Sequence, residues 1–451
     1  RTMQFQLTTD YLEKVVQLIA NNDRIALRQL LKDLHFADVA ELLEELNSEQ
    51  ATFLIKSLES EITSEALMEL DEDDREKILN RLSPVEIAKE IEEMDTDDAA
   101  DVVAELDDHI QKKVIEKIED EEHASDIVEL LTYEEDTAGA LMAKELVKVK
   151  ETWTVAGCVR EMRRQAENVT RVHSIYVTDK DDKLKGRLSL KDLLTASAKT
   201  HISDVYISKV DYVSVHAKDE EVAKIMQKYD LEAIPVVDQE GVLVGRITID
   251  DIIDFIKEEA EKDYQLAAGI SQDVEADDNI YQLTKARLPW LILGLLGGLG
   301  SVYILQGFDE ALSNYPILFF FTPLIAAMAG NVGVQSSAII VQGLANGVVK
   351  GSMFNRLLKE VGLALINGSI LGILVVLFGA LVDQEFIVSF TIALSMLSVI
   401  IIASLIGTFV PIILDRKGID PAIATGPFIT TSNDIFGIFL FFYIAKLILG
   451  F

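Results

Sequence analysis

The sequence contains one cysteine, Cys158, among 451 residues. A single cysteine cannot form an internal disulfide, so the chain has no disulfide framework. This composition suits a reducing compartment, where structural disulfides are rare. The folded state must therefore be held together by the packing of its hydrophobic residues.

Basic residues are also scarce. The chain has 41 Lys and Arg against 75 Asp and Glu, a formal net charge of −34. The imbalance lies in residues 1–287, which hold 35 of the basic and 67 of the acidic residues. A region this acidic is excluded from binding nucleic acid through phosphate contacts. It attracts divalent cations, which prefer carboxylate oxygens; the alternative is that the acids only keep the region soluble.

The last third of the chain has little charge of either sign. This region has five long apolar segments joined by four connections. The second and fourth connections carry the basic residues Lys350, Arg356, Lys359, Arg416 and Lys417, whereas the first and third have none. The positive-inside rule places the basic connections in the cytoplasm, with residues 1–287 inside and the C-terminus outside. Five apolar segments are long enough to span a bilayer, at 288–306, 316–345, 361–382, 386–414 and 421–450.

Residues 8–132 show helical periodicity and no strand pattern, which predicts about ten short helices. A unit of acid, x, Ala, x, x, apolar, x, x, apolar begins at Asp38, Glu86 and Asp98. Its apolar positions share one helix face, so we expect a superhelical array of stacked helices. The densest acidic cluster lies at one predicted helix N-terminus and consists of Asp95, Asp97, Asp98 and Asp101. A favourable interaction with the helix dipole explains one or two acids at such a position, but less easily four.

Residues 175–192 and 234–251 align without a gap. Each predicts a strand, a turn, a second strand and a helix, with the motif Gly-x-x-Ser/Thr-x-x-Asp at the end. This repeat resembles a tandem pair of CBS domains. The resemblance implies a disc with clefts that hold adenosine nucleotides such as ATP, with phosphate and ribose met by Ser189 with Asp192 and by Thr248 with Asp251. Many CBS pairs instead bind no ligand and act as dimerisation and switching modules.

The helix that ends the second copy continues toward the first apolar segment. Asp251, Asp254, Glu258 and Glu261 recur along one of its faces. Like charges at this spacing repel each other, so a bound cation would stabilise the row. The alternative is an ordinary solvated face.

Asp434 is the only carboxylate within the five predicted segments. A charge at membrane depth costs at least ~2.5–3.5 kcal/mol, so this residue marks a functional site. Gly and Pro interrupt the second and fifth segments and free backbone carbonyls as ligands. Further neutral oxygens come from Asn331, Gln335, Thr430, Thr431 and Asn433; the alternative for Asn331 and Gln335 is hydrogen bonding between helices.

This ligand set contains no thiolate and no imidazole, so it suits Mg²⁺ or Ca²⁺ and is poor for Zn²⁺ or Cu²⁺. Mg²⁺ keeps most of its waters and uses one or two carboxylates, as one Asp434 from each chain of a dimer would supply. The argument favours Mg²⁺ and leaves Mn²⁺ and Co²⁺ open.

Taken together, the chain resembles the MgtE family of magnesium channels and transporters. The words that carry the resemblance are Tyr133-Glu-Glu-Asp-Thr-Ala-Gly-Ala-Leu-Met142, Gly330-Asn331 with Gln335, Asp420-Pro421-Ala422 and Thr-x-x-Asp434. The implied fold is a multidomain membrane protein. Its parts are an all-α superhelical N domain at 1–132, α/β CBS domains at 133–199 and 200–256, a connecting (plug) helix at 257–284 and a five-helix transmembrane domain at 285–451.

The resemblance implies a homodimeric, non-enzymatic importer of Mg²⁺ in the bacterial plasma (inner) membrane, closed by cytosolic Mg²⁺. Asp434 would be the central pore ligand, with the carbonyl near Thr430, and Asp420 and Asp263 would lie at the cytoplasmic mouth. Regulatory Mg²⁺ sites would use Asp97, Asp101, Glu220, Asp230, Asp251, Asp254 and Glu259. The chain departs from many members by having Gly426 instead of a polar residue before the proline of the fifth span.

Other functions fit the sequence less well. An intramembrane aspartyl protease needs two membrane carboxylates, and an anion channel needs basic residues, of which the spans contain only Lys446 near the end. A CBS-containing divalent cation exporter and a Co²⁺- or Mn²⁺-permeable transporter remain as alternatives. A soluble part that only holds the dimer together is the alternative to a sensing role.

Overall fold

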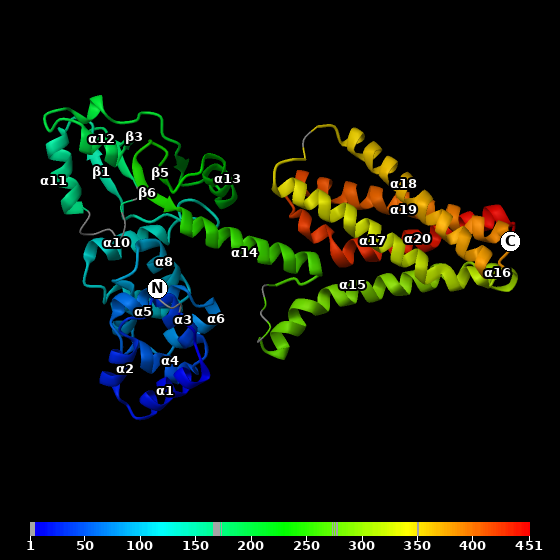
Figure 1. Ribbon diagram of the computed structural model, residues 1–451, viewed down its shortest axis with the longest axis horizontal. Coiled ribbons are helices and arrows are strands. Elements are labelled where there is room, and N and C mark those ends of the chain that lie inside the picture. Colours follow the sequence, from blue (N-terminus) through cyan, green and yellow to red (C-terminus); the bar gives the residue numbers. More distant parts are fainter. Residues whose placement is uncertain are drawn as a thin grey trace. The chain divides into compact units, whose positions relative to one another are not determined.

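The computed structural model describes residues 5–165, 172, 174–272, 274, 276, 278–349 and 351–451. Lys350, one of the basic residues used to orient the membrane segments, lies outside the described residues. The chain forms two compact units, Arg1–Ile256 and Lys257–Phe451 (Figure 1).

The first unit begins with the predicted array of ten short helices, drawn in blue to cyan in Figure 1. Their starts carry the expected caps: Ser83 and Glu86 form a capping box, with Pro84 at the first helical position. The helices are α1 (Thr9–Ala20), α2 (Arg24–Leu31), α3 (Phe36–Glu44), α4 (Ser48–Ile55), α5 (Ser60–Met68), α6 (Glu72–Leu79), α7 (Pro84–Ile91), α8 (Thr96–Ala104), α9 (Asp108–Ile115) and α10 (Glu121–Leu130).

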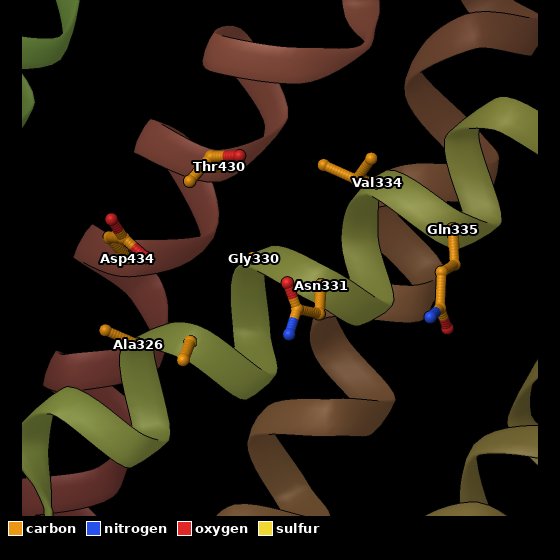
Figure 2. Close-up of a pocket in the computed structure, with 8 residues that line it drawn as sticks. Ala326, Gly330, Asn331, Val334, Gln335, Thr430 and Asp434 are labelled. Atoms are coloured by element: carbon orange, nitrogen blue, oxygen red, sulfur yellow. The ribbon is translucent and has the colours of Figure 1, made fainter.

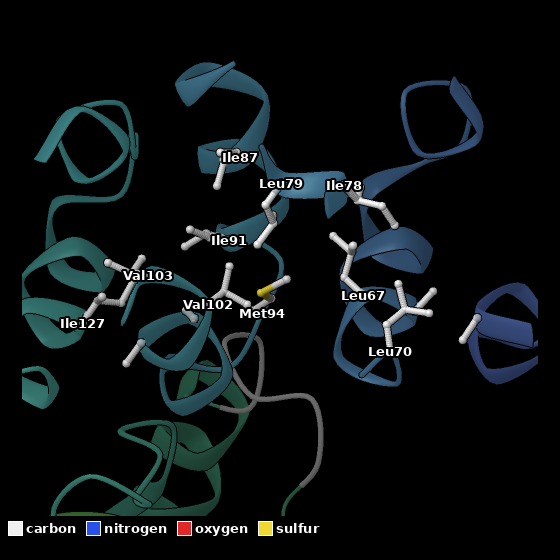
Figure 3. Close-up of a cluster of buried hydrophobic side chains, with 14 of the residues drawn as sticks. Leu67, Leu70, Ile78, Leu79, Ile87, Ile91, Met94, Val102, Val103 and Ile127 are labelled. Atoms are coloured by element: carbon white, nitrogen blue, oxygen red, sulfur yellow. The ribbon is translucent and has the colours of Figure 1, made fainter. Parts of the chain in front are cut away.

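The array is held together by the apolar faces of its helices. Side chains such as Leu67, Ile91 and Val102 are fully buried, and Figure 3 shows them converging from neighbouring helices. The alanines of the three repeated units are also buried: Ala40, Ala88 and Ala100. Because alanine is small, the neighbouring helix can approach closely at these points, as the repeat predicted.

Two small sheets follow. In the first, β2 (Ile175–Thr178) pairs in parallel with β1 (Val147–Lys150) and antiparallel with β3 (Leu184–Leu188). The second repeats this order with β4 (Val213–Ser214), β5 (Ala233–Val237) and β6 (Leu243–Thr248). The associated helices are α11 (Val155–Gln165), α12 (Leu190–Thr195), the 3₁₀ turn η2 (Ile202–Asp204) and α13 (Asp219–Tyr229).

The two α/β copies contact each other through their β-hairpins in a reciprocal way. The Leu184 amide donates to the Gly241 carbonyl at 3.0 Å, and the Leu243 amide donates to the Asp182 carbonyl at 3.0 Å. The first copy has its own hydrophobic core, which includes Cys158. The second copy shares one continuous core with the helical array, so the array is docked on this copy in the structure.

The connecting helix differs from its predicted limits. Helix α14 runs from Ile249 to Ala268, without a break after the second copy. It ends at Gly269, whose φ of +80° is the left-handed conformation typical of a helix C-terminus. A new helix then begins at Ile280, capped by Asn279. Residues 257–284 are therefore not one helix, because a glycine and a cap separate two.

The second unit contains five helices that are long and apolar enough to cross a membrane. Most ends agree with the predicted segments to within a few residues, but α15 and α18 each begin eight residues earlier because their polar first turns are helical too. The bounds are α15 (Ile280–Gln306), α17 (Ile317–Ala345), α18 (Met353–Leu381), α19 (Phe386–Arg416) and α20 (Gly426–Leu449), with the short α16 (Asp309–Asn314) and η3 (Pro421–Ala424) between them.

Small residues bring the membrane helices together. A Cβ added at Gly333 of α17 would overlap the Asn433 amide of α20, and one added at Gly407 of α19 would overlap the Gly333 carbonyl. The connecting helix reaches the same bundle, since a Cβ at Gly426 would overlap the Ala267 carbonyl. Close packing of this kind is the main source of association between helices in a membrane.

Candidate ion-binding sites

A groove of about 320 Å³ lies between α17 and α20. Figure 2 shows Thr430 and Asp434 on α20 opposite a run of residues on α17. Asn331 and Gln335 are exposed in it. The full lining is Ala326, Ala327, Gly330, Asn331, Val334, Gln335, Thr430 and Asp434.

The groove residues are presented by close contact between the two helices. Gly330 of α17 packs against the methyl group of Thr430, where an added Cβ would lie 3.3 Å from it. Thr430 lies one turn before Asp434, and its hydroxyl donates to the Gly426 carbonyl at 3.0 Å. The Thr430 hydroxyl therefore has an intrahelical acceptor, and its oxygen is on the same helix as the Asp434 carboxylate.

Two of the neutral oxygens suggested by the sequence lie elsewhere. Thr431 packs against Gly297 of α15. Asn433 is buried, contacts Gly333 and donates to the Ala329 carbonyl at 3.3 Å. Neither residue lines the groove, so helical spacing, and not polarity, decides which side chains face it.

The residues predicted for the cytoplasmic mouth lie on separate elements of the second unit. Asp420 is exposed, and its carboxylate caps η3 by accepting from the Ala422 amide at 2.8 Å. Asp263 is half-buried on α14. The structure thus shows Asp420 as the cap of η3, a role that is separate from the predicted binding of ions.

A second acidic site lies in the first unit, where the N-terminus of α8 meets the start of α14. Burial, with the charges of Asp98 and Asp251, raises the pKa of Asp97 well above its ordinary value. Burial and Asp251 likewise raise the pKa of Asp98 to about 8. The predicted cluster on α8 is therefore joined by Asp251, which is 153 residues further along the chain than Asp98.

Two residues that the sequence analysis missed hold this cluster in place. The Glu145 carboxylate accepts from the Thr96 amide at 3.2 Å and from its hydroxyl at 2.9 Å, so it caps α8 from a distant segment. Arg246 of β6 forms an ion pair with Asp95 at 3.2 Å and donates to the Glu145 carbonyl. Arg246 occupies the position of Arg187 in the repeat, and this duplication was the available signal.

The remaining predicted regulatory residues are more exposed. Asp254 lies on α14 one turn after Asp251, and Asp101 lies one turn after Asp97. Glu259 is on the same helix as Asp254 and pairs with Lys262 at 2.8 Å. Glu220 and Asp230 lie at opposite ends of α13. Among the described residues, no group of three or more acids, histidines or cysteines is arranged so that it could hold a metal ion.

The cluster predicts a pH dependence in the absence of metal. We expect the contact of α8 with α14 to weaken between about pH 4 and pH 8. The folded-state pKa of Asp98, about 8, lies above the ordinary value of 3.8. Its contribution to stability is therefore complete below about pH 3.8 and is lost as the pH rises through about 8.

Hydrogen exchange of α8 in the full chain, in detergent and chelator and corrected for intrinsic rates, measures this effect. We expect protection to fall with pH in the wild type and to be flatter in Asp98→Asn. Helix α1, which carries none of these acids, is the internal control. Protection of α8 that does not change with pH would contradict the assignment.

The two copies of the CBS motif differ in what their side chains do. In the second, the Thr248 hydroxyl donates to Asp251 at 2.6 Å and the Thr248 amide to the same oxygen at 2.8 Å. In the first, Ser189 begins α12 without a side-chain cap bond. Thr248 is also buried, whereas Ser189 and Asp192 are partly exposed. A ligand thus has better access to the motif of the first copy.

Comparison with known proteins follows the same order of parts. The MgtE intracellular N domain matches residues 34–136, the CBS domain matches 138–199 and 202–258, and the MgtE divalent cation transporter domain matches 322–444. A solved structure of the cytosolic domain of the Mg²⁺ channel MgtE in complex with ATP is 34% identical, with a TM-score of 0.51 over 54% of this chain and 99% of that one.

Two magnesium transporters are similar to this chain over about 70% of their own length. Magnesium transporter MgtE of Enterococcus faecalis is 37% identical over 71% of each chain, and that of Bacillus subtilis is 35% identical over 70% of each. The chain therefore belongs to the MgtE family of magnesium transporters, which are transport proteins and not enzymes.

Proposed function

We propose that the chain imports Mg²⁺ through the groove between α17 and α20, with Asp434 as the central ligand. The observation that carries this proposal is the placement of one carboxylate beside two exposed amides, Asn331 and Gln335, on a membrane domain. Oxygen ligands with a single carboxylate suit a cation that keeps most of its water. The names of the relatives, magnesium transporters, support the same ion.

The groove is open on one side, which supports a homodimer. Asn331 and Gln335 are exposed in the single chain although they belong to a membrane domain. A second copy related by a two-fold axis would cover them and bring a second Asp434 to the ion. Two carboxylates would then balance the charge of one hydrated Mg²⁺.

The orientation in the membrane follows from the two ends of the domain. The protein is a multi-pass membrane protein with an intracellular N domain. With five spans the C-terminus would lie outside, and the positive-inside rule supports the same orientation. We assign the protein to the bacterial plasma membrane, where import would deliver Mg²⁺ to the side that carries the acidic array.

Control of the pore is assigned to the acidic cluster of the first unit. When cytosolic Mg²⁺ is high, ions would neutralise Asp97, Asp98 and Asp251 and hold the array against the second CBS domain. When Mg²⁺ falls, the carboxylates repel each other and this contact weakens. The ion must bind the closed state more tightly than the open one, since equal affinity would shift no equilibrium. The other predicted acids would add further ligands: the exposed Asp101, Glu220, Asp230 and Asp254, and the half-buried Glu259.

The end of α14 supplies a mechanical link to the pore helix. Gly426 opens α20 with a φ of +44° and lies against the Ala267 carbonyl. In Gly426→Ala, the new methyl group would overlap that carbonyl and separate the two helices. We expect about five- to tenfold more internal Mg²⁺ to be needed to halve uptake, which corresponds to roughly 1–1.4 kcal/mol.

The control for this variant is Gly418→Ala. Gly418 also has a positive φ, +70°, but nothing lies within 4 Å of an added Cβ. It therefore carries the backbone strain without the steric overlap. Dose–response curves for internal Mg²⁺ in proteoliposomes measure both variants. Equal curves for the two glycine variants would contradict the role of the Gly426 contact.

The CBS pair is proposed to bind an adenosine nucleotide in its first copy. Ser189 and Asp192 are accessible, whereas Thr248 and Asp251 are bonded to each other. The solved relative in complex with ATP supports this ligand class. Isothermal titration of the full chain with ATP, for wild type and Asp192→Ala, tests the assignment, and equal affinities would exclude Asp192.

Reconstitution into proteoliposomes tests the transport function. Wild-type protein should accelerate Mg²⁺ entry, followed with an internal Mg²⁺ indicator, over empty vesicles. The main alternatives are an exporter and a transporter of Mn²⁺ or Co²⁺. Mg²⁺ loss from loaded vesicles against a gradient would favour the exporter, and entry of Mn²⁺ or Co²⁺ without Mg²⁺ would favour the other.

A further inference from the structure

The membrane domain contains a second carboxylate that lies outside the groove. Glu360 belongs to α18, in the eight residues by which this helix extends beyond its predicted apolar segment. Its Oε2 atom accepts from the Ser404 hydroxyl of α19 at 2.9 Å and from the Ser336 hydroxyl of α17 at 3.4 Å. The two serine oxygens are themselves 3.2 Å apart. Three helices therefore meet at one small polar triangle.

The triangle lies in a largely buried environment. Ser404 is 2% exposed and Ser336 is 7% exposed, and Glu360 is half-buried. Among the described residues, no basic side chain forms an ion pair with Glu360. The two serine hydroxyls are thus the side-chain donors that bond this carboxylate, and hydrogen bonds to a charged acceptor are stronger than neutral ones.

The bonded serine is directly beside a groove residue. Ser336 follows Gln335 in α17, and successive residues of a helix point about 100° apart. Fixing the direction of Ser336 therefore fixes the direction of Gln335, and of Asn331 one turn earlier. If the hydrogen bonds of Ser336 were lost or moved, α17 could rotate about its axis.

Close packing next to the hydrogen bonds of Ser336 also restrains the turn of α17 that carries the groove residues. One turn before Ser336, Gly333 contacts Asn433 of α20, the residue next to Asp434. One turn after Ser404, Gly407 contacts the Gly333 carbonyl and Ser336 itself. The groove-bearing turn of α17 is therefore held by α20 on one side and by α19 and α18 on the other.

We propose that Glu360 is a positioning residue for ion binding: its carboxylate, through Ser336 and Ser404, sets the rotation of α17 so that Asn331 and Gln335 face the groove. The inference rests on the proposed transport of Mg²⁺ through that groove. Glu360 itself does not contact the ion. Its removal should weaken the binding of Mg²⁺ more than it lowers the maximal rate.

Mg²⁺ uptake into proteoliposomes over a range of external Mg²⁺ tests the proposal. We expect Glu360→Ala to raise the half-saturating Mg²⁺ concentration about tenfold, the size expected when a bond to a charged acceptor is lost. Glu360→Gln keeps an acceptor oxygen for the serines and should stay within about twofold of wild type. Glu385→Gln is the matched control, since Glu385 is an exposed glutamate at a helix start with no side-chain cap bond.

A second measurement reads the rotation of α17 without transport. Gln335→Cys, in a chain whose Cys158 is replaced by Ala, should react with a water-soluble thiol reagent, and adding Glu360→Ala should cause a loss of that reactivity. Unchanged half-saturation and unchanged reactivity would overturn the positioning role. So would an equal fall of maximal rate in Glu360→Ala and Glu360→Gln with half-saturation unaltered. A wild type that carries no Mg²⁺ would overturn the proposed function as well, whereas Glu360→Ala equal to an active wild type would overturn only this inference.

Discussion

Replacing Asp434 by Ala is expected to reduce Mg²⁺ uptake at least about 100-fold, a loss that corresponds to roughly 2.8 kcal/mol. Asp434 is the one carboxylate that lines the groove, and the other lining side chains are neutral. Without its charge, a divalent cation would have to leave bulk water for amide and hydroxyl oxygens alone. Uptake into proteoliposomes at low internal Mg²⁺, where the pore is open, measures the effect.

Two further variants show whether the charge itself matters. Asp434→Asn keeps the shape and an oxygen, and we expect it to lose nearly as much uptake as Asp434→Ala. Asp383→Asn removes a carboxylate from an exposed turn between α18 and α19 and should transport as the wild type does. If Asp434→Asn were as active as the wild type, the groove would bind the ion through neutral ligands and the assignment of Asp434 would be wrong.

The second large effect is expected from the cytosolic cluster. In the triple variant Asp97→Asn, Asp98→Asn, Asp251→Asn, we expect the response to internal Mg²⁺ to disappear. Burial raises the pKa of all three carboxyl groups, and the charge of Asp251 raises it further at Asp97 and Asp98. We expect the three carboxylates to repel each other when they are ionised and no ion is bound. Amides neither repel nor bind Mg²⁺ strongly, so the array should stay docked on the second CBS domain with or without the ion.

Limited proteolysis of the full chain and the uptake assay should agree on this variant. The wild type should become protease-resistant in the array only when Mg²⁺ is added, whereas the triple variant should be resistant in chelator and show low uptake at all internal Mg²⁺ levels. The matched control removes three exposed charges from other helices: Glu49→Gln, Glu61→Gln and Glu72→Gln. If the triple variant still responded to internal Mg²⁺ as the wild type does, these three acids would not be part of the Mg²⁺ sensor.

Much of the fold could be predicted from the sequence because its patterns are local. The repeated unit with Ala40, Ala88 and Ala100 predicted stacked helices, and these alanines are buried. The alignment of residues 175–192 with residues 234–251 predicted two α/β copies, and each has the same strand order. Continuity between the second copy and α14 was also predicted, since nothing in residues 249–268 breaks a helix.

Other parts could not be predicted because they depend on contacts between distant segments. Glu145 caps a helix 49 residues earlier, and Arg246 pairs with Asp95 across 151 residues. Neither residue belongs to a motif of acidic ligands. Glu360 was missed because hydropathy marks only the apolar part of a helix, while α18 begins in a charged turn. Thr431 and Asn433 were assigned to the site by polarity, although their helix faces point to α15 and α17.

The central claim is that the ion carried by the pore also controls it. Its most direct test is the rate of Mg²⁺ entry into proteoliposomes loaded with low or high internal Mg²⁺, at the same electrochemical driving force, for wild type and Asp434→Ala. We predict rapid entry for the wild type at low internal Mg²⁺, slow entry at high internal Mg²⁺, and background entry for Asp434→Ala at both. Equal wild-type rates at the two internal concentrations, or rapid entry in Asp434→Ala, would contradict the account.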